Sequence, residues 1–142
     1  MGNLSAHFTR SEAACHHCGR FPEMPWQGEL LDGLEALRSL AYPTGLVVLS
    51  WYRCAEYNAT LPHAAADSMH VRCAAVDPAM STTATVAAVR GLRRFSGIGW
   101  QMVDGRKLVR HVDVRHLTGH NLTGGTVRYP TLWEYLPDGS RR

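Results

Sequence analysis

An Asp-Gly pair between two strand-like runs places the strongest constraint on how this chain can fold. Asp104-Gly105 follows residues 97–102 and precedes residues 108–114, and both flanking runs are rich in apolar residues. Turns of this composition join antiparallel strands, because Asp and Gly tolerate the positive backbone angles that a tight hairpin requires. The sequence therefore predicts an antiparallel hairpin over residues 97–114.

Three helices are predicted before this hairpin. Residues 29–40 carry leucines at the spacing of an amphipathic helix with one buried face, at Leu30, Leu31, Leu34, Leu37 and Leu40. A short helix is expected near residues 11–15, with Ser11 as its cap. Another is expected over residues 81–94, with Ser81 or Thr82 as its cap.

The remaining strands complete an α+β plan. Residues 46–50 are predicted to form a buried strand, and residues 71–77 a second one. Because strands and helices do not alternate regularly, we expect a mostly antiparallel central sheet flanked by helices. Trp133 and Tyr135, in the Gly- and Thr-rich tail, are expected to pack on the core.

Length, composition and charge narrow the class of protein. The 142 residues are 45% hydrophobic, which predicts a single domain over residues 1–142 with a real core and no membrane span. The first residues lack the basic and apolar regions of a secretory signal, so we expect synthesis in the cytoplasm. A net charge of +3 favours approach to an anionic polymer such as a cell wall. The arginines are scattered, which argues against nucleic-acid binding.

Two segments carry the candidate chemistry, one containing His70 and Asp77 and the other containing His111 and Asp113. Two histidines and a carboxylate are ligands of catalytic zinc, whose fourth position stays open to water. His111 and Asp113 are two residues apart on a predicted strand, so they should point to the same face. His70 and Asp77 are an odd number of residues apart, so a loop or bulge must lie between them. If His70, Asp77 and His111 meet in space, the chain is predicted to be a hydrolase.

The neighbours of these residues extend the pattern into a family resemblance. Ser68-x-His70-x-x-Cys73-x-Ala75-x-Asp77 resembles the Ser-x-His-x-x-Gly-x-Ala-x-Asp signature of the zinc D-Ala-D-Ala carboxypeptidase and murein endopeptidase family, which shares its fold with the hedgehog signalling domain. Other blocks resemble the carboxypeptidase-like branch found in bacteriophages and bacteria. They keep their order over residues 4–114 and are Leu4-Ser5-x-His7-Phe8-x-x-x-Glu12, Cys15-x-x-Cys18-Gly19, Ser50-Trp51-Tyr52-Arg53 with Asn58, Gly97-Ile98-Gly99, and His111-Val112-Asp113-Val114.

The resemblance implies a zinc-dependent peptidase that hydrolyses amide bonds in peptidoglycan stem peptides, as a D-Ala-D-Ala carboxypeptidase, a murein endopeptidase or a phage endolysin. By this resemblance His70, Asp77 and His111 are the zinc ligands. Arg53 would pair with a substrate carboxylate, which suits its planar fork of donors, and Ser68 would support substrate binding. We expect a monomer that reaches the cell wall on phage lysis or in a virion.

The chain departs from the family pattern at two points. Cys73 stands where glycine is usual; we expect it to be tolerated, on the assumption that this position does not need a positive φ. Relatives carry Glu or His shortly before the last ligand, where this chain has Leu108 and Val109. The base that accepts a proton from water is therefore predicted first at Asp113, then at Asp104 or His116. Asp113 could instead orient a ligand through an outer hydrogen bond.

Two alternatives remain open at this point. Cys15-His16-His17-Cys18 could form half of a second, structural zinc site completed by Cys54 or Cys73, or it could be a tight turn with free or disulfide-bonded thiols. The whole chain could also be a non-catalytic zinc-containing binding module, since a fold does not fix a function.

Overall fold

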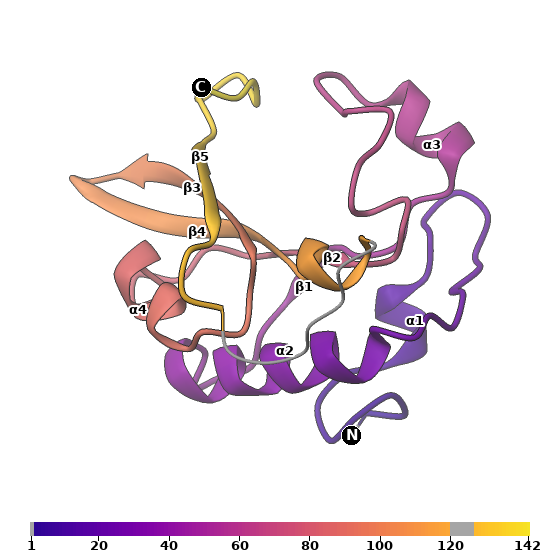
Figure 1. Cartoon of the computed structure of the whole chain (residues 1–142), viewed down its shortest axis with the longest axis horizontal. Helices are drawn as coiled ribbons and strands as arrows, with labels where there is room; N and C mark the ends of the chain where they lie inside the picture. Colours follow the sequence, from indigo (N-terminus) through magenta and orange to yellow (C-terminus); the bar gives the residue numbers. More distant parts are fainter. Residues whose placement is uncertain (1, 120–126) are drawn as a thin grey trace.

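A single five-stranded sheet organises the described part of the chain, residues 2–119 and 127–142 of a computed structural model (Figure 1). The strand order is β1-β2-β4-β3-β5, and every neighbouring pair is antiparallel except β3 and β5. The strands are β1 (Val48–Ser50), β2 (Ala75–Pro78), β3 (Gly97–Val103), β4 (Arg106–Asp113) and β5 (Thr131–Glu134). The predicted α+β class with a mostly antiparallel sheet is confirmed.

The helices are short apart from α2 (Gln27–Ala41), which runs along one side of the sheet in Figure 1. The others are α1 (Arg10–Ala13), α3 (Ala55–Thr60) and α4 (Val86–Gly91), with a 3-10 turn, η1 (Arg115–Leu117). Within the described residues, no helix has the length and apolar character needed to cross a membrane.

The β3–β4 hairpin forms at the predicted Asp-Gly turn. Asp104 and Gly105 have φ of 50° and 76°, and the register runs from Val103 opposite Arg106 to Gly97 opposite Asp113. Positive φ at both central residues matches the right-handed twist of the flanking strands. The hairpin therefore fixes the register of β4 against β3, and with it the position of His111 on β4.

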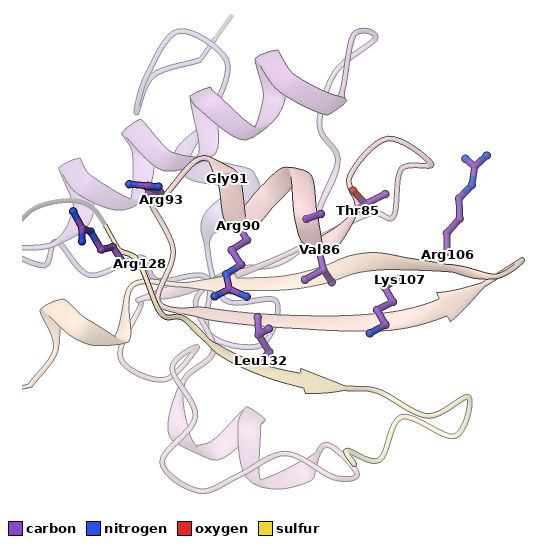
Figure 2. Close-up of a pocket in the computed structure, with 10 residues that line it drawn as sticks. Thr85, Val86, Arg90, Gly91, Arg93, Arg106, Lys107, Arg128 and Leu132 are labelled. Carbon is purple, nitrogen blue, oxygen red and sulfur yellow. The ribbon is translucent and has the colours of Figure 1, made fainter.

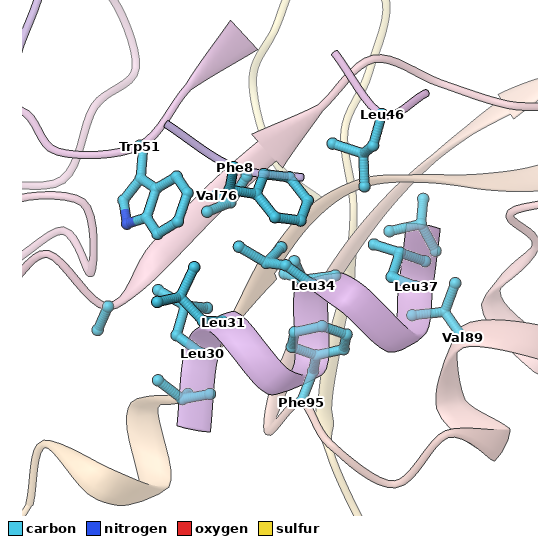
Figure 3. Close-up of a cluster of buried hydrophobic side chains, with 14 of the residues drawn as sticks. Phe8, Leu30, Leu31, Leu34, Leu37, Leu46, Trp51, Val76, Val89 and Phe95 are labelled. Atoms are coloured by element: carbon cyan, nitrogen blue, oxygen red, sulfur yellow. The ribbon is translucent and has the colours of Figure 1, made fainter. Parts of the chain in front are cut away.

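The leucine stripe of α2 supplies much of the hydrophobic core. Leu30, Leu34 and Leu37 are fully buried, and they pack with Val76 and Phe95 (Figure 3). The expectation that Leu40 is buried is wrong, because 46% of it is exposed and Ala41 takes the inward position in the last turn. Burying a leucine side chain stabilises a fold by roughly 2 kcal/mol, so this stripe is a main source of stability.

The pairing of the three central strands separates an apolar face from a functional one. Val112 lies opposite both Val76 and Ile98, and all three are fully buried in the core cluster that includes α2. Successive strand residues point to opposite faces. The neighbouring residues Asp77 and His111 therefore project from the other face, away from α2.

Two helix caps differ from the prediction. Thr9, not Ser11, caps α1: its side chain accepts from the Glu12 N–H, and the Glu12 carboxylate accepts from the Thr9 N–H. Helix α4 begins after Thr85, whose hydroxyl accepts from the Ala88 N–H. Ser81 instead donates to the Ala41 carbonyl at 2.7 Å, which keeps residues 81–84 out of the helix.

Three predictions for the strands and the tail are corrected. Strand β1 is an edge strand rather than a buried one, since it pairs only with β2 and leaves 56% of Leu49 exposed. Strand β2 begins only at Ala75, because residues 71–73 form a turn. The tail adds β5 beside β3, and its Trp133 and Tyr135 pack over the functional face rather than on the hydrophobic core.

Candidate metal centre

Three donor atoms converge on the functional face of the sheet. His70 Nε2 lies 3.1 Å and His111 Nδ1 lies 3.0 Å from Asp77 Oδ1. Bonds of about 2.0–2.1 Å in a tetrahedral zinc site would put neighbouring N and O ligand atoms roughly 3.3 Å apart. The two histidines are buried, whereas 30% of the Asp77 side chain is exposed. The group can therefore hold a metal ion with one side open.

His70 is presented by a tight backbone turn and fixed by a carbonyl. The Val71 N–H donates to Ser68 O and the Cys73 N–H to His70 O, which confirms the irregular segment predicted before Asp77. His70 Nδ1–H donates to the Trp51 carbonyl at 2.7 Å, so Nε2 is left to bind a metal. Burial lowers the pKa of His70 and favours the neutral imidazole that metals require.

His111 is fixed by a buried carboxylate. Its Nε2–H donates to Asp113 Oδ2 at 2.8 Å, so its Nδ1 faces Asp77. Asp113 is fully buried, and Arg115 donates to it from its backbone N–H and from Nε and Nη2. Burial alone would raise the pKa of Asp113, but the His111 and Arg115 hydrogen bonds hold that pKa well below its usual range. A carboxylate behind a histidine in this way sets the tautomer and direction of a metal ligand.

Asp77 stays ionised between the two histidines. Burial would raise its pKa, but His70 and His111 outweigh that effect and lower the pKa well below its ordinary range. An anionic oxygen beside two imidazole nitrogens is a donor set that suits Zn²⁺.

Two glycines on β3 make room for this arrangement. A Cβ at Gly97 would overlap the Asp113 carboxylate, and one at Gly99 would overlap Tyr135 and lie 2.7 Å from Trp133 Nε1. The Gly97-Ile98-Gly99 block therefore lets the side chains of β4 and β5 lie flat across β3.

Two adjoining pockets flank the donor atoms. One, of about 190 Å³, is lined by Asp77 together with Arg53, Arg110, Tyr135 and Arg141. The other, of about 210 Å³, is lined by His111 together with Ser68, Arg115 and Arg141. Arg141 is common to both, so the metal centre opens into a divided, arginine-rich hollow.

A family model described as peptidase M15 matches residues 6–113. The chain belongs to this family. Its members use zinc, and the matched segment contains all three donor residues and Arg53. Membership implies a zinc metallopeptidase, a hydrolase with a peptide substrate. No curated protein matches the chain.

The position where the family signature has glycine does require an unusual backbone. Cys73 has a φ of 56°, so the expectation that this site has no need of a positive φ is wrong. A left-handed backbone costs an ordinary residue roughly 1–2 kcal/mol. The Cys73 side chain is buried in the hydrophobic core and is not part of the group that can hold the metal.

The three base candidates lie in different surroundings. Asp113 is in contact with His111, as described above. Asp104 occupies the turn at the opposite end of β4 from His111, which puts roughly 20 Å of strand between them and excludes a shared water. His116 Nδ1 lies 2.6 Å from Ser96 Oγ, and His116 lines neither of the two pockets.

Arg53 and Ser68, the predicted substrate-binding residues, both line the hollow. Arg53 Nε is buried and has no hydrogen-bond partner among the described residues, and burial lowers the pKa of this arginine. Ser68 Oγ accepts from the His70 N–H at 3.2 Å. Arg53 therefore has a donor available to a ligand, while Ser68 supports the backbone that carries His70.

Trp133 and Tyr135 form the aromatic wall of the site. The Trp133 ring packs on His111 with centroids 4.9 Å apart, and the Arg115 and Arg141 guanidinium groups lie 4.8 and 5.0 Å from its centre. Arg110 lies 4.4 Å from the centre of the Tyr135 ring. Arg110 is an extra residue in β4, where the register shifts between Gly99 and Trp100, and such bulges redirect side chains beside active sites.

A larger hollow of about 770 Å³ lies elsewhere on the molecule, lined in part by α4, β4 and β5 (Figure 2). Among the residues that the structure describes, it shares no lining residue with the two pockets at the metal centre, and its lining contains no acid or metal ligand. Its lining includes five basic side chains, Arg90, Arg93, Arg106, Lys107 and Arg128. This basic pocket has the character of a surface for anions rather than of a catalytic site.

Proposed function

We propose that the chain hydrolyses amide bonds in peptidoglycan stem peptides, with His70, Asp77 and His111 as the ligands of one catalytic zinc ion. The observation that carries the proposal is the convergence of two buried histidines on one aspartate oxygen, each histidine held from behind by its own partner. Three protein ligands leave a position for water, which is the arrangement of catalytic rather than structural zinc.

The zinc ion, when bound, lowers the pKa of its water and polarises the scissile carbonyl. The protein residues bind and orient the peptide. Arg53 Nε lacks a hydrogen-bond partner within residues 2–119 and 127–142, and Arg53, Arg110 and Arg141 line one pocket with Asp77. Three arginines favour a substrate with carboxylates, as in a stem peptide that contains D-Glu or ends in D-Ala. Release of the chain by a lysing phage would bring it to this substrate.

The sequence left two roles open for Asp113, general base or orienting partner of His111. We assign it the orienting role. Its carboxylate accepts from His111 and three times from Arg115, so taking a proton would require these bonds to break. A low pKa also makes it a poor proton acceptor near neutral pH.

The basic pocket supports an anionic polymer as the wider partner. Its five cationic side chains would attract a charged wall polymer over a distance set by the ionic strength. Binding through this pocket should weaken as salt is added.

Digestion of purified murein tests the proposal. Zinc-loaded protein should release D-Ala or new amino termini, identified by mass spectrometry, and the His111→Ala variant should lose both its catalytic zinc and this activity. If the protein binds zinc at this centre but cleaves neither murein nor model peptides, the chain is a zinc-containing binding module instead.

A further inference from the structure

We propose that Cys15, Cys18 and Cys54, with His17, bind a second zinc ion that is structural. The Sγ atoms of the three cysteines lie within 4.8 Å of one another, although Cys54 lies far along the chain from the other two. All four cysteines of the chain are free thiols in the structure. Converging thiols without a disulfide are the donor set of a structural zinc site.

His17 lies on the Cys54 side of the cluster and is the donor we assign to the fourth position; because it lies outside the group of three thiols, its ring must turn toward Cys15 and Cys18 to complete the sphere. Its Nδ1 lies 3.6 Å from Cys54 Sγ. Tetrahedral zinc with bonds of about 2.3 Å to sulfur and 2.0 Å to nitrogen places these two atoms roughly 3.5 Å apart. The imidazole stacks on Tyr57, with centroids 6.1 Å apart and planes 5° from parallel, which holds the ring beside the thiols.

The backbone around the cluster is arranged to support thiolates. The Cys54 N–H donates to Cys15 Sγ, and the Tyr57 N–H donates to Cys54 Sγ, both at 3.4 Å. The Gly19 N–H donates to Cys15 O at 2.8 Å, and the φ of 72° at Gly19 closes the turn that brings Cys18 back beside Cys15. N–H donors to sulfur stabilise the anionic ligand that zinc requires.

The structure also decides which later cysteine belongs to the cluster. Cys73 is excluded because it lies among core residues and outside the group of three. With three thiolates and one imidazole the coordination sphere would be full, which distinguishes this site from the open one at His70, Asp77 and His111.

This second zinc would brace the pocket from the N-terminal side. Cys54 directly follows Arg53, and the Tyr52 N–H donates to Ala13 O at 3.1 Å in the same segment. Trp51, whose carbonyl fixes His70, begins that segment. The zinc would thus hold residues 51–54 against the first part of the chain. The second zinc site would serve this role whichever reaction the other centre performs.

Metal analysis of variants tests it. In a His70→Ala, His111→Ala double variant one zinc ion per chain should remain, and adding Cys15→Ser or Cys54→Ser should remove it. Cobalt bound to the double variant should show the charge-transfer absorption of a thiolate-bound metal. Cys73→Gly, which suits the backbone at that position, is the control and should keep this metal. A double variant that binds no zinc, or cobalt spectra without thiolate bands, would overturn the proposal.

A thiol assay on the wild-type protein guards against variants that fail to fold. Zinc should protect the three cluster cysteines from a thiol-reactive dye, and a strong chelator should expose them. Equal labelling with and without zinc would overturn the proposal. Zinc-dependent protection in a protein that cleaves no murein would support the structural site while refuting the proposed peptidase.

Discussion

Replacing Asp113 with asparagine separates the two roles that this residue could have. The substitution keeps the size of the side chain but removes the charge that holds His111 Nε2–H and Arg115. If Asp113 orients His111, the ligand loses its fixed direction and some basicity, and zinc affinity should fall about 10- to 100-fold. That loss corresponds to about 1.4–2.8 kcal/mol. With zinc restored by excess metal, kcat should stay within about tenfold of wild type.

A general base would give the opposite pattern. Zinc affinity would hardly change, and kcat at saturating zinc would fall about 10²- to 10⁴-fold. Zinc affinity is measured by competition with a chromophoric chelator, and kcat on a model peptide across a series of free zinc concentrations. Unfolding in urea shows whether the Arg115 guanidinium, left without its anion, destabilises the fold enough to confuse the comparison.

Asp104→Asn is the matched control because it makes the same chemical change in the exposed β3–β4 turn, where asparagine also tolerates positive φ. It should alter neither zinc affinity nor kcat. Unchanged zinc affinity in Asp113→Asn, together with a collapse of kcat, would refute the orienting role.

Four further predictions follow from the contacts of single residues. Burial would raise the pKa of Glu35, but hydrogen bonds from Ser5, His7 and Arg38 lower it to about 2. The resulting stability is present above the unfolded-state pKa near 4.5 and is lost as pH falls through the folded pKa of about 2. Glu35→Gln should therefore cost roughly 1 kcal/mol in urea unfolding at pH 7, and this cost should shrink steadily as pH falls from 4.5 to 2. Gly97→Ala should push the Asp113 carboxylate aside and lower stability by about 1–3 kcal/mol with weaker zinc binding; normal zinc binding would contradict the clash. Arg53→Lys should lower kcat/KM about tenfold or more on peptides with a free carboxylate and much less on amidated ones, with zinc content unchanged; equal losses on both would rule out carboxylate pairing. Arg141→Ala should lower kcat/KM by roughly tenfold while zinc affinity is kept, whereas Arg142→Ala, which removes only an exposed pair with Glu134, should do neither.

Local patterns predicted the elements that depend on neighbouring residues. The leucine spacing located α2, and Asp104-Gly105 located the hairpin, because both signals depend on residues close in sequence. The same reasoning began β2 too early, at residue 71. The amino-acid sequence carries no signal that Cys73 adopts a positive φ, which ends the extended conformation there. This reasoning also chose the wrong N-cap for α4. Ser81, Thr82 and Thr85 can all cap a helix, and Ser81 is taken out of this role by its hydrogen bond to the Ala41 carbonyl.

The part of the site that the sequence missed comes from the tail. Strand β5 pairs with β3 in parallel, so its neighbours are distant in sequence and leave no local signature. Tyr135 and Arg141 reach the pocket only through that pairing, and both lie beyond the segment that matches the family.

The pocket around Arg53 is therefore assembled from three parts of the chain. The middle supplies the donors His70, Asp77 and His111 from the central strands and the turn before them, where close packing leaves little freedom. The N-terminal cysteine cluster holds Cys54, the residue after Arg53, and the C-terminal strand places aromatic rings and Arg141 over the same pocket. Metal binding therefore depends mainly on the central strands, and substrate choice mainly on the arginines that the two ends of the chain bring to the pocket. A substitution at Arg141 should therefore change which peptide is bound before it changes whether the catalytic metal is held.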